Sequence, residues 1–150
     1  MNLGTILQNH VLWTGMVGWI LAQVLKVPVD LIRERRWNWA LFFAAGGMPS
    51  SHTSLVTSTA MAVGLHLGFN DPLFAVAVAL AMVVVYDATG VRRQAGMQAR
   101  KINILVEELL KGHPINEQHL REVIGHTPLE ALFGVLLGLV IAVGLWLWWK

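Results

Sequence analysis

Four long apolar segments alternate with polar stretches along the chain. They run from about Ile6 to Leu25, from about Thr53 to Phe69, from about Leu73 to Tyr86 and from about Pro128 to Trp149. The first is long enough to cross the hydrocarbon core of a bilayer as a helix, which takes about 20 residues. We predict that all four cross the membrane as helices and are joined by polar loops.

Two of these segments carry glycines at the spacing that lets helices pack closely. Gly64 and Gly68 in the second segment, and Gly134 and Gly138 in the fourth, each form a GxxxG pair. The second segment is also rich in serine, threonine and alanine, and small residues allow helix backbones in a membrane to approach. We predict that the second helix is central in the bundle and that the third, after the short loop Asn70–Pro72, returns antiparallel to it.

Three further stretches predict helical pieces outside the spans. The segment from Trp37 to Ala45 is apolar but short, and its tryptophans favour an interfacial or re-entrant position. Lys101–Lys111 is amphipathic, and we expect it to be a lid, a dimer contact or a membrane-surface anchor. We predict another short helix over Asn116–Ile124. The whole pattern predicts an all-α integral membrane protein with about four transmembrane helices plus interfacial helices, in a single domain over residues 1–150.

The composition also favours a membrane protein. Hydrophobic residues make up 55% of the chain and charged residues only 13%, about half of the ~25% that is typical of soluble domains. The chain has no cysteine, which excludes disulfides and thiolate catalysis. No secretory signal peptide is evident before the first span. We expect membrane lipids as partners, and no nucleic acid.

The basic residues predict how the chain sits in the membrane. They fall in the two loops that follow the first and third spans, whereas the opposite side carries only Lys150. The loop residues are Lys26, Arg33, Arg35, Arg36, Arg92, Arg93, Arg100, Lys101, Lys111 and Arg121. Because basic loops stay in the cytoplasm, we predict a multi-pass cell-membrane protein with both termini on the non-cytoplasmic side. His52 and His126 then lie at the cytoplasmic ends of their spans.

The stretch 46–53, with the sequence GGMPSSHT, lies just before the second span. Its glycines and proline favour a turn, and Ser50 and Ser51 supply hydroxyls where a helix begins. A helix N-terminus favours phosphate through its free N–H groups and its positive dipole end. His52 adds a group that can hold or release a proton near neutral pH. The simpler alternative is a capped helix start with an incidental histidine.

A second histidine stretch, 125–130 with the sequence GHTPLE, precedes the fourth span. Thr127 as N-cap, Pro128 at the first helical position and Glu130 three residues after Thr127 predict a capping box. The same spacing allows the Glu130 carboxylate to orient His126, as in a nucleophilic or basic imidazole. From these residues alone, the stretch can be either a structural helix cap or the place of a catalytic histidine.

Asp87 follows the third span and is accompanied by Arg92 and Arg93. A carboxylate so close to the membrane is costly unless it is paired, and Arg92 or Lys26 is a suitable partner. The alternative is that the charged cluster only controls the topology or forms an ion pair.

Several segments together resemble a known superfamily. The tetrapeptide 49–52 (PSSH) is similar to the P-S-G-H motif of the type 2 phosphatidic acid phosphatase superfamily, and His126-x3-Glu130 is similar to the end of its third motif. Lys26-x6-Arg33 matches the spacing of its first motif. Together with 86–96 (YDATGVRRQAG), these segments resemble the divergent branch of that superfamily, small membrane proteins related to acid phosphatases and vanadium haloperoxidases. The resemblance covers essentially the whole chain.

The resemblance implies a PAP2-like helical bundle that carries a lipid phosphate phosphatase site. It assigns His126 as the nucleophile that forms a phosphohistidine, Glu130 as the carboxylate that orients its ring, and His52 as the general acid for the leaving alcohol. The implied phosphate ligands are Lys26, Arg33 and the backbone around Ser50 and Ser51. We add Arg92 or Arg93 as the candidate that replaces in space an arginine missing from the third motif, with Asp87 in support. The implied chemistry uses no metal and no other cofactor.

The chain departs from the superfamily pattern at several positions. Glu34 replaces a proline and Ser51 a glycine, and the arginine expected six residues before the third-motif histidine is Leu120, with Arg121 beside it. Four spans are fewer than the usual six of the lipid phosphatases, so a homodimer is one way to close the pocket. A cytoplasmic site also differs from the many bacterial lipid phosphatases of this superfamily that act on the outer face.

We predict hydrolysis of a lipid phosphomonoester or diphosphate at the cytoplasmic face. Candidate substrates are phosphatidic acid, phosphatidylglycerophosphate and a polyprenyl phosphate or diphosphate. The alternative is a non-catalytic protein that binds anionic lipid headgroups, or a membrane scaffold, for which a basic interfacial loop is enough. Catalysis requires both His52 and His126, whereas headgroup binding depends on the lysine and arginines. Haloperoxidase activity is a more distant third hypothesis.

Overall fold

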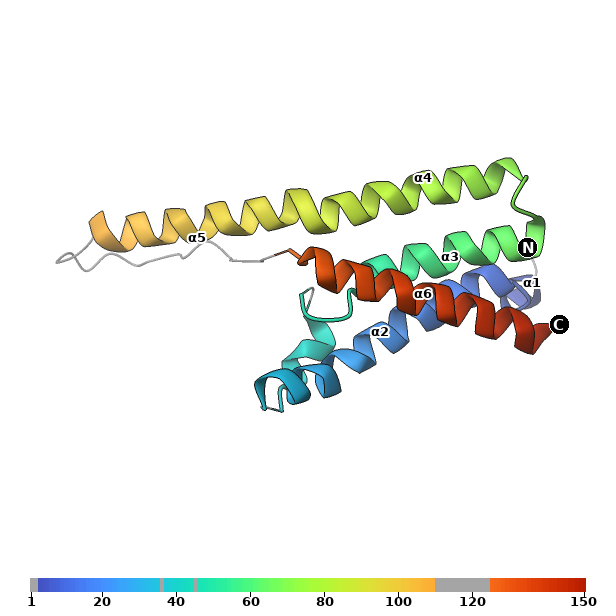
Figure 1. Cartoon of the computed structure of the whole chain (residues 1–150), viewed down its shortest axis with the longest axis horizontal. Helices are drawn as coiled ribbons and strands as arrows, with labels where there is room; N and C mark the ends of the chain where they lie inside the picture. Colours follow the sequence, from blue (N-terminus) through green and yellow to red (C-terminus); the bar gives the residue numbers. More distant parts are fainter. Residues whose placement is uncertain (1–2, 36, 45, 110–124) are drawn as a thin grey trace.

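The computed structural model describes residues 3–35, 37–44, 46–109 and 125–150, and every regular element in these ranges is helical (Figure 1). The elements are α1 (Leu3–Leu7), α2 (His10–Glu34), the 3-10 helix η1 (Trp39–Phe43), α3 (Ser51–Leu67), α4 (Pro72–Tyr86), the π-helical turn η2 (Asp87–Val91), α5 (Arg92–Leu109) and α6 (Pro128–Trp149). The prediction of an all-α membrane protein is confirmed.

Three of the described helices are long and apolar enough to cross a bilayer. They are His10–Glu34, Pro72–Val106 and Pro128–Trp149. The remaining long element, α3, has 17 residues and is therefore about 25 Å long, somewhat short of the ~30 Å hydrocarbon core. The predicted number of four spans stays a prediction.

Helix α3 is the centre of the bundle, as its small residues predict. It packs against α2, α4 and α6. On the α6 side, a Cβ atom on Gly134 would lie 2.5 Å from the Ser50 carbonyl oxygen, and one on Gly138 would lie 2.7 Å from the Ser54 carbonyl oxygen. On the α2 side, the Ser54 hydroxyl donates a hydrogen bond to the Gly18 carbonyl oxygen at 2.9 Å. Small residues therefore let α3 contact backbone on two sides.

The other predicted glycine pair has a different role. A Cβ atom on Gly64 would meet the rings of Phe69 and Phe74, and Gly68 ends α3 with a φ of +107°. The pair therefore shapes the turn into α4 rather than a seam with α2 or α6. Asp71 caps α4 by accepting a hydrogen bond from the Leu73 N–H at 2.7 Å, and α4 returns alongside α3 as predicted (Figure 1).

Two helices continue past the points where the sequence pattern ends them. The basic residues from Lys26 onward do not end α2, which runs through Pro28 to Glu34. The polar stretch after Tyr86 does not break the third span either, because η2 joins α4 to α5 in one continuous helix that extends beyond the bundle (Figure 1). Inside a membrane protein, a continued helix satisfies its own backbone polar groups, which favours continuation over a loop.

The segment after α2 folds back onto that helix. The Gln23 side-chain amide donates a hydrogen bond to the Phe42 carbonyl oxygen at 2.6 Å, and the Lys26 ammonium donates one to the Ala44 carbonyl oxygen at 2.8 Å. Trp39 and Phe43 remain exposed, as expected for a piece in contact with the membrane interface. Side chains of α2 thus hold η1 and its flanking residues in place.

Both termini lie at one end of the bundle (Figure 1). The His10 ring stacks on the Trp149 ring there, with centroids 4.4 Å apart. The first turns of α3 and α6 lie at the opposite end. Lys111, the predicted helix 116–124, Arg36, Leu120 and Arg121 lie outside the described residues.

The close contact between α3 and α6 generates a stability prediction. We expect Gly138→Ala to lower the free energy of unfolding by about 1–3 kcal/mol, because the added methyl group would meet the Ser54 carbonyl oxygen. Thermal unfolding of the purified protein in detergent measures this loss. Gly144→Ala on the same helix is the matched control, since nothing lies within 4 Å of the Cβ position there. Equal losses in the two variants would contradict backbone contact at Gly138.

Candidate active site

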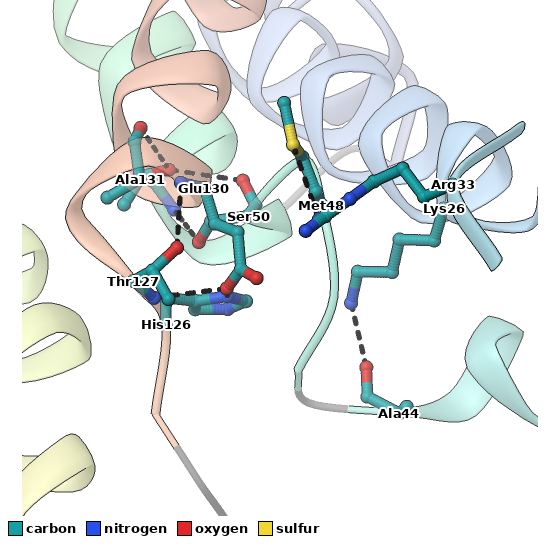
Figure 2. A network of polar contacts seen from close by, with 10 residues as sticks. Lys26, Arg33, Ala44, Met48, Ser50, His126, Thr127, Glu130 and Ala131 are labelled. Atoms are coloured by element: carbon teal, nitrogen blue, oxygen red, sulfur yellow. Dashed lines mark hydrogen bonds and ion pairs between the residues drawn. The ribbon is translucent and has the colours of Figure 1, made fainter. Parts of the chain in front are cut away.

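The start of α6 places a carboxylate beside a histidine. Thr127 caps the helix by accepting a hydrogen bond from the Glu130 N–H at 3.3 Å, and the Glu130 carboxylate accepts one from the Thr127 N–H at 3.1 Å. The same carboxylate oxygen lies 3.2 Å from Nδ1 of His126 (Figure 2). The capping box and the oriented histidine are therefore both present, and one carboxylate serves both.

The His126 ring is held on one side and unpartnered on the other. Its side chain is 4% exposed, and Nε2 is buried without a hydrogen-bond partner among the described residues. When Nδ1–H donates to the Glu130 carboxylate, Nε2 carries the lone pair of the neutral ring. A buried polar atom without a partner is unfavourable for folding. An unpaired, oriented imidazole nitrogen is what nucleophilic catalysis requires.

The backbone of His126 is attached to the long helix formed by α4, η2 and α5. Its N–H donates a hydrogen bond to the Ala88 carbonyl oxygen at 2.9 Å. Gly125 permits this approach, because a Cβ atom there would lie 2.5 Å from the backbone nitrogen of Arg93 and 2.8 Å from the Ala88 carbonyl oxygen. Ala88 belongs to the π-helical turn η2, and turns of this kind are frequent at functional sites.

His52 lies in the first turn of α3, next to His126. The two ring centroids are 6.3 Å apart, with the ring planes at 57°. Burial lowers the pKa of the His52 imidazole below its ordinary value, and electrostatic interactions with Arg92, His126 and Lys26 lower this pKa further, with Asp87 acting in the opposite direction. An anion bound among these cations would favour the protonated form of His52.

The first turn of α3 is tied to the first turn of α6. The Ser50 hydroxyl caps α3 by accepting a hydrogen bond from the Thr53 N–H at 3.4 Å, while the Ser50 N–H donates to the Glu130 carbonyl oxygen at 3.1 Å. Both Ser50 and Ser51 are buried. The predicted N-cap is present, but the Ser50 N–H is already bonded and is not free for a phosphate oxygen.

Lys26 and Arg33 lie on the same helix, seven positions apart and therefore on one face. Both border a polar cavity of about 240 Å³ that also contacts Glu130. Lys26 is 1% exposed and uses one N–H to bind Ala44 (Figure 2), which leaves two of its three donors for a ligand. The cavity is lined by Lys26, Val29, Asp30, Arg33, Glu34, Leu41, Gly47, Met48 and Glu130.

Two residues of this cavity, Asp30 and Glu34, escape the motif-based prediction. They follow Lys26 by four and eight positions, which is the spacing of a single helix face. The signal is present in the sequence once α2 is known to continue through Pro28. Asp30 is half-buried and Glu34 is exposed, so water screens their charges more than that of the buried Lys26.

The charged cluster after α4 forms an ion pair across η2. The Arg92 Nε–H donates to an Asp87 carboxylate oxygen at 2.6 Å, so Asp87 pairs with Arg92 rather than with Lys26. Arg93 is exposed. In the described ranges, no group of three or more histidine and carboxylate side chains comes together that could hold a metal ion.

Comparison with known proteins gives a family and one relative. The model of the divergent PAP2 family matches residues 7–141. An uncharacterized membrane protein of Bacillus subtilis (strain 168), YuiD, is 40% identical over 147 residues, which cover 91% of this chain and 93% of the relative. No solved structure matches the chain at a significant level. The matched range includes every predicted site residue.

The double use of Glu130 generates a prediction that does not depend on turnover. We expect Glu130→Ala to lower the free energy of unfolding by about 0.5–2 kcal/mol through loss of the cap, and to release the His126 ring from its fixed tautomer. Glu130→Gln should keep most of the stability, because glutamine also completes a capping box. Thermal unfolding measures the first effect, and ¹⁵N chemical shifts of the imidazole measure the second. Parent-like imidazole shifts in Glu130→Ala would refute the orienting contact.

Proposed function

The chain belongs to the divergent PAP2 family, and from this premise we propose that it is a lipid phosphate phosphatase that acts through a phosphohistidine on His126. The observation that carries the proposal is the state of that ring: Glu130 holds Nδ1 at 3.2 Å, and Nε2 is buried and unpaired. His52 lies beside it. The proposed substrate is a phosphomonoester or diphosphate of a membrane lipid.

The first step transfers the phosphoryl group to the protein. The lone pair on Nε2 of His126 attacks phosphorus, the bond between phosphorus and the lipid oxygen breaks, and the leaving oxygen takes a proton from the His52 imidazolium. From a phosphomonoester the products are a lipid alcohol, a phosphohistidine and a neutral His52, and from a diphosphate the lipid monophosphate leaves in place of the alcohol. Glu130 stabilises the positive charge that the attacking ring acquires, as a carboxylate does for an imidazolium in a catalytic triad.

The second step returns the protein to its starting state. Neutral His52 takes a proton from a water molecule whose oxygen attacks phosphorus, and the bond from phosphorus to Nε2 of His126 breaks. Inorganic phosphate leaves, His52 is again protonated and His126 is again neutral. Over the cycle His52 gives one proton to the leaving group and regains one from water, while His126 only accepts and releases the phosphoryl group, so no proton or electron is left unbalanced.

The cations of the site stabilise charge in this scheme. Lys26 and Arg33 border the polar cavity, and Arg92 lies close enough to depress the pKa of His52. Fixed positive groups in a partly desolvated site stabilise a phosphate dianion and its transition state more strongly than they would in water. Arg93 is included among the proposed phosphate ligands because it follows Arg92 in the chain. The site faces the cytoplasm if the basic loops obey the positive-inside rule.

The two histidines give the decisive test of the proposed function. We expect phosphate release from lipid phosphates in mixed micelles, with His126→Ala reducing it by at least about 10³-fold and His52→Ala by about 10²–10⁴-fold. His66→Ala is the matched control, because it removes a histidine from the opposite end of the same helix. No release from any lipid phosphate, with parent and variants binding anionic vesicles equally, would leave the headgroup-binding alternative.

The assignment of His52 as general acid makes a separate prediction. A nitrophenyl phosphate has a leaving group that departs without a proton, so His52→Ala should retain most of the parent's rate of phosphoenzyme formation with it while losing activity on alkyl phosphates. Rapid-quench measurement of acid-labile label on the protein follows this step. His126→Ala should form no labelled protein with either substrate. A loss in His52→Ala that is the same for both leaving groups would reject the general-acid role.

A further inference from the structure

A groove with apolar walls opens beside the polar cavity, between α2 and α6. It has a volume of about 200 Å³ and is lined by Leu25, Val29, Met48, Pro49, Phe133 and Leu137. Val29 and Met48 line both the groove and the polar cavity. The two hollows therefore adjoin, and one molecule with a charged end and an apolar end can occupy both.

The spacing of the lining residues gives the groove a direction. On α6, Phe133 and Leu137 follow Glu130 at intervals of three and four positions, so the three share one helix face. On α2, Leu25, Val29 and Arg33 are also spaced by four. The groove thus runs along both helices away from the charged residues, toward the part of each helix that lies in the membrane.

We propose that this groove holds the hydrocarbon chain of a lipid phosphate whose chain begins at the phosphoester oxygen, as in a polyprenyl or long-chain alkyl phosphate. The inference rests on the proposed function, since it places the phosphate of the same molecule in the adjoining cavity. None of the six lining side chains carries an N–H or O–H donor. The ester carbonyls of a diacylglycerol phosphate would lose their hydrogen bonds to water there without replacement.

The size and position of the groove support one chain over two. Its volume is below the ~300–1,000 Å³ of sites that enclose a drug-sized ligand, which suits the first part of a single chain. A larger apolar cavity of about 510 Å³ lies between α3 and α4, lined by residues such as Met61, Val78 and Met82. That cavity shares no lining residue with the polar one, so a chain attached to a phosphate in the polar cavity favours the groove.

A non-hydrolysable photoaffinity probe tests the placement without relying on turnover. The probe is a long-chain alkyl phosphonate with a diazirine near its headgroup, used on the full-length protein in lipid nanodiscs. We expect adducts at Met48, Phe133 or Leu137. Leu137→Trp should reduce this labelling by about tenfold by filling the groove. Leu136→Trp, the same substitution at an exposed neighbour outside the groove, should leave it unchanged, and Phe133→Trp serves if Leu137→Trp fails to fold.

Each outcome of the experiment decides one point. Adducts on the cavity between α3 and α4, or equal labelling of the two leucine variants, would overturn the proposed chain site. Competition by a diacyl phosphatidate as strong as that by an alkyl phosphate would overturn the preference for chains without esters. Groove labelling in a protein that releases no phosphate would uphold the chain site and reject the phosphatase. Phosphate release without groove labelling would reject the chain site and uphold the phosphatase.

Discussion

The contact between the first turns of α3 and α6 determines where both histidines lie. The Ser50 N–H donates to the Glu130 carbonyl oxygen, and the Thr53 hydroxyl donates to the Ala131 carbonyl oxygen at 3.2 Å. Gly134 permits these bonds, because any Cβ atom there would collide with the Ser50 backbone. Unpaired backbone groups are costly in a membrane protein, so two helix ends that satisfy each other form a firm junction. The site is built on that junction.

The sequence predicts the starts of the helices better than their ends. Ser50 and the Thr127–Glu130 capping box are recognisable because a cap uses residues within four positions of each other. Lys26 and Pro28 look like the end of a span, yet the Lys26 ammonium donates a hydrogen bond to a carbonyl group from another segment and α2 continues. Partners that lie far along the chain cannot be inferred from the local pattern.

In the candidate site, too, contacts between residues close in sequence are predictable, whereas contacts that depend on helix packing are not. The contact of His126 with Glu130 spans four positions and follows from one capping motif. The approach of His52 to His126 depends on how α3 packs against α6. The basic loops predict that both histidines lie at the same membrane face, and the resemblance to a family predicts that they share one site. Asp30 becomes predictable once α2 is known to be continuous, because it then shares a face with Lys26. The hydrogen bond from the Ser50 N–H goes to the Glu130 carbonyl oxygen of α6, and the sequence around Ser50 does not predict it.

The continuous helix made of α4, η2 and α5 has a mechanical consequence. The 18 residues of α5 correspond to about 27 Å of helix, and they project past the bundle like an arm (Figure 1). The base of this arm carries the Ala88 carbonyl group that holds the backbone of His126. Because α4, η2 and α5 form one continuous helix, the direction of the arm and the position of this carbonyl group are set together.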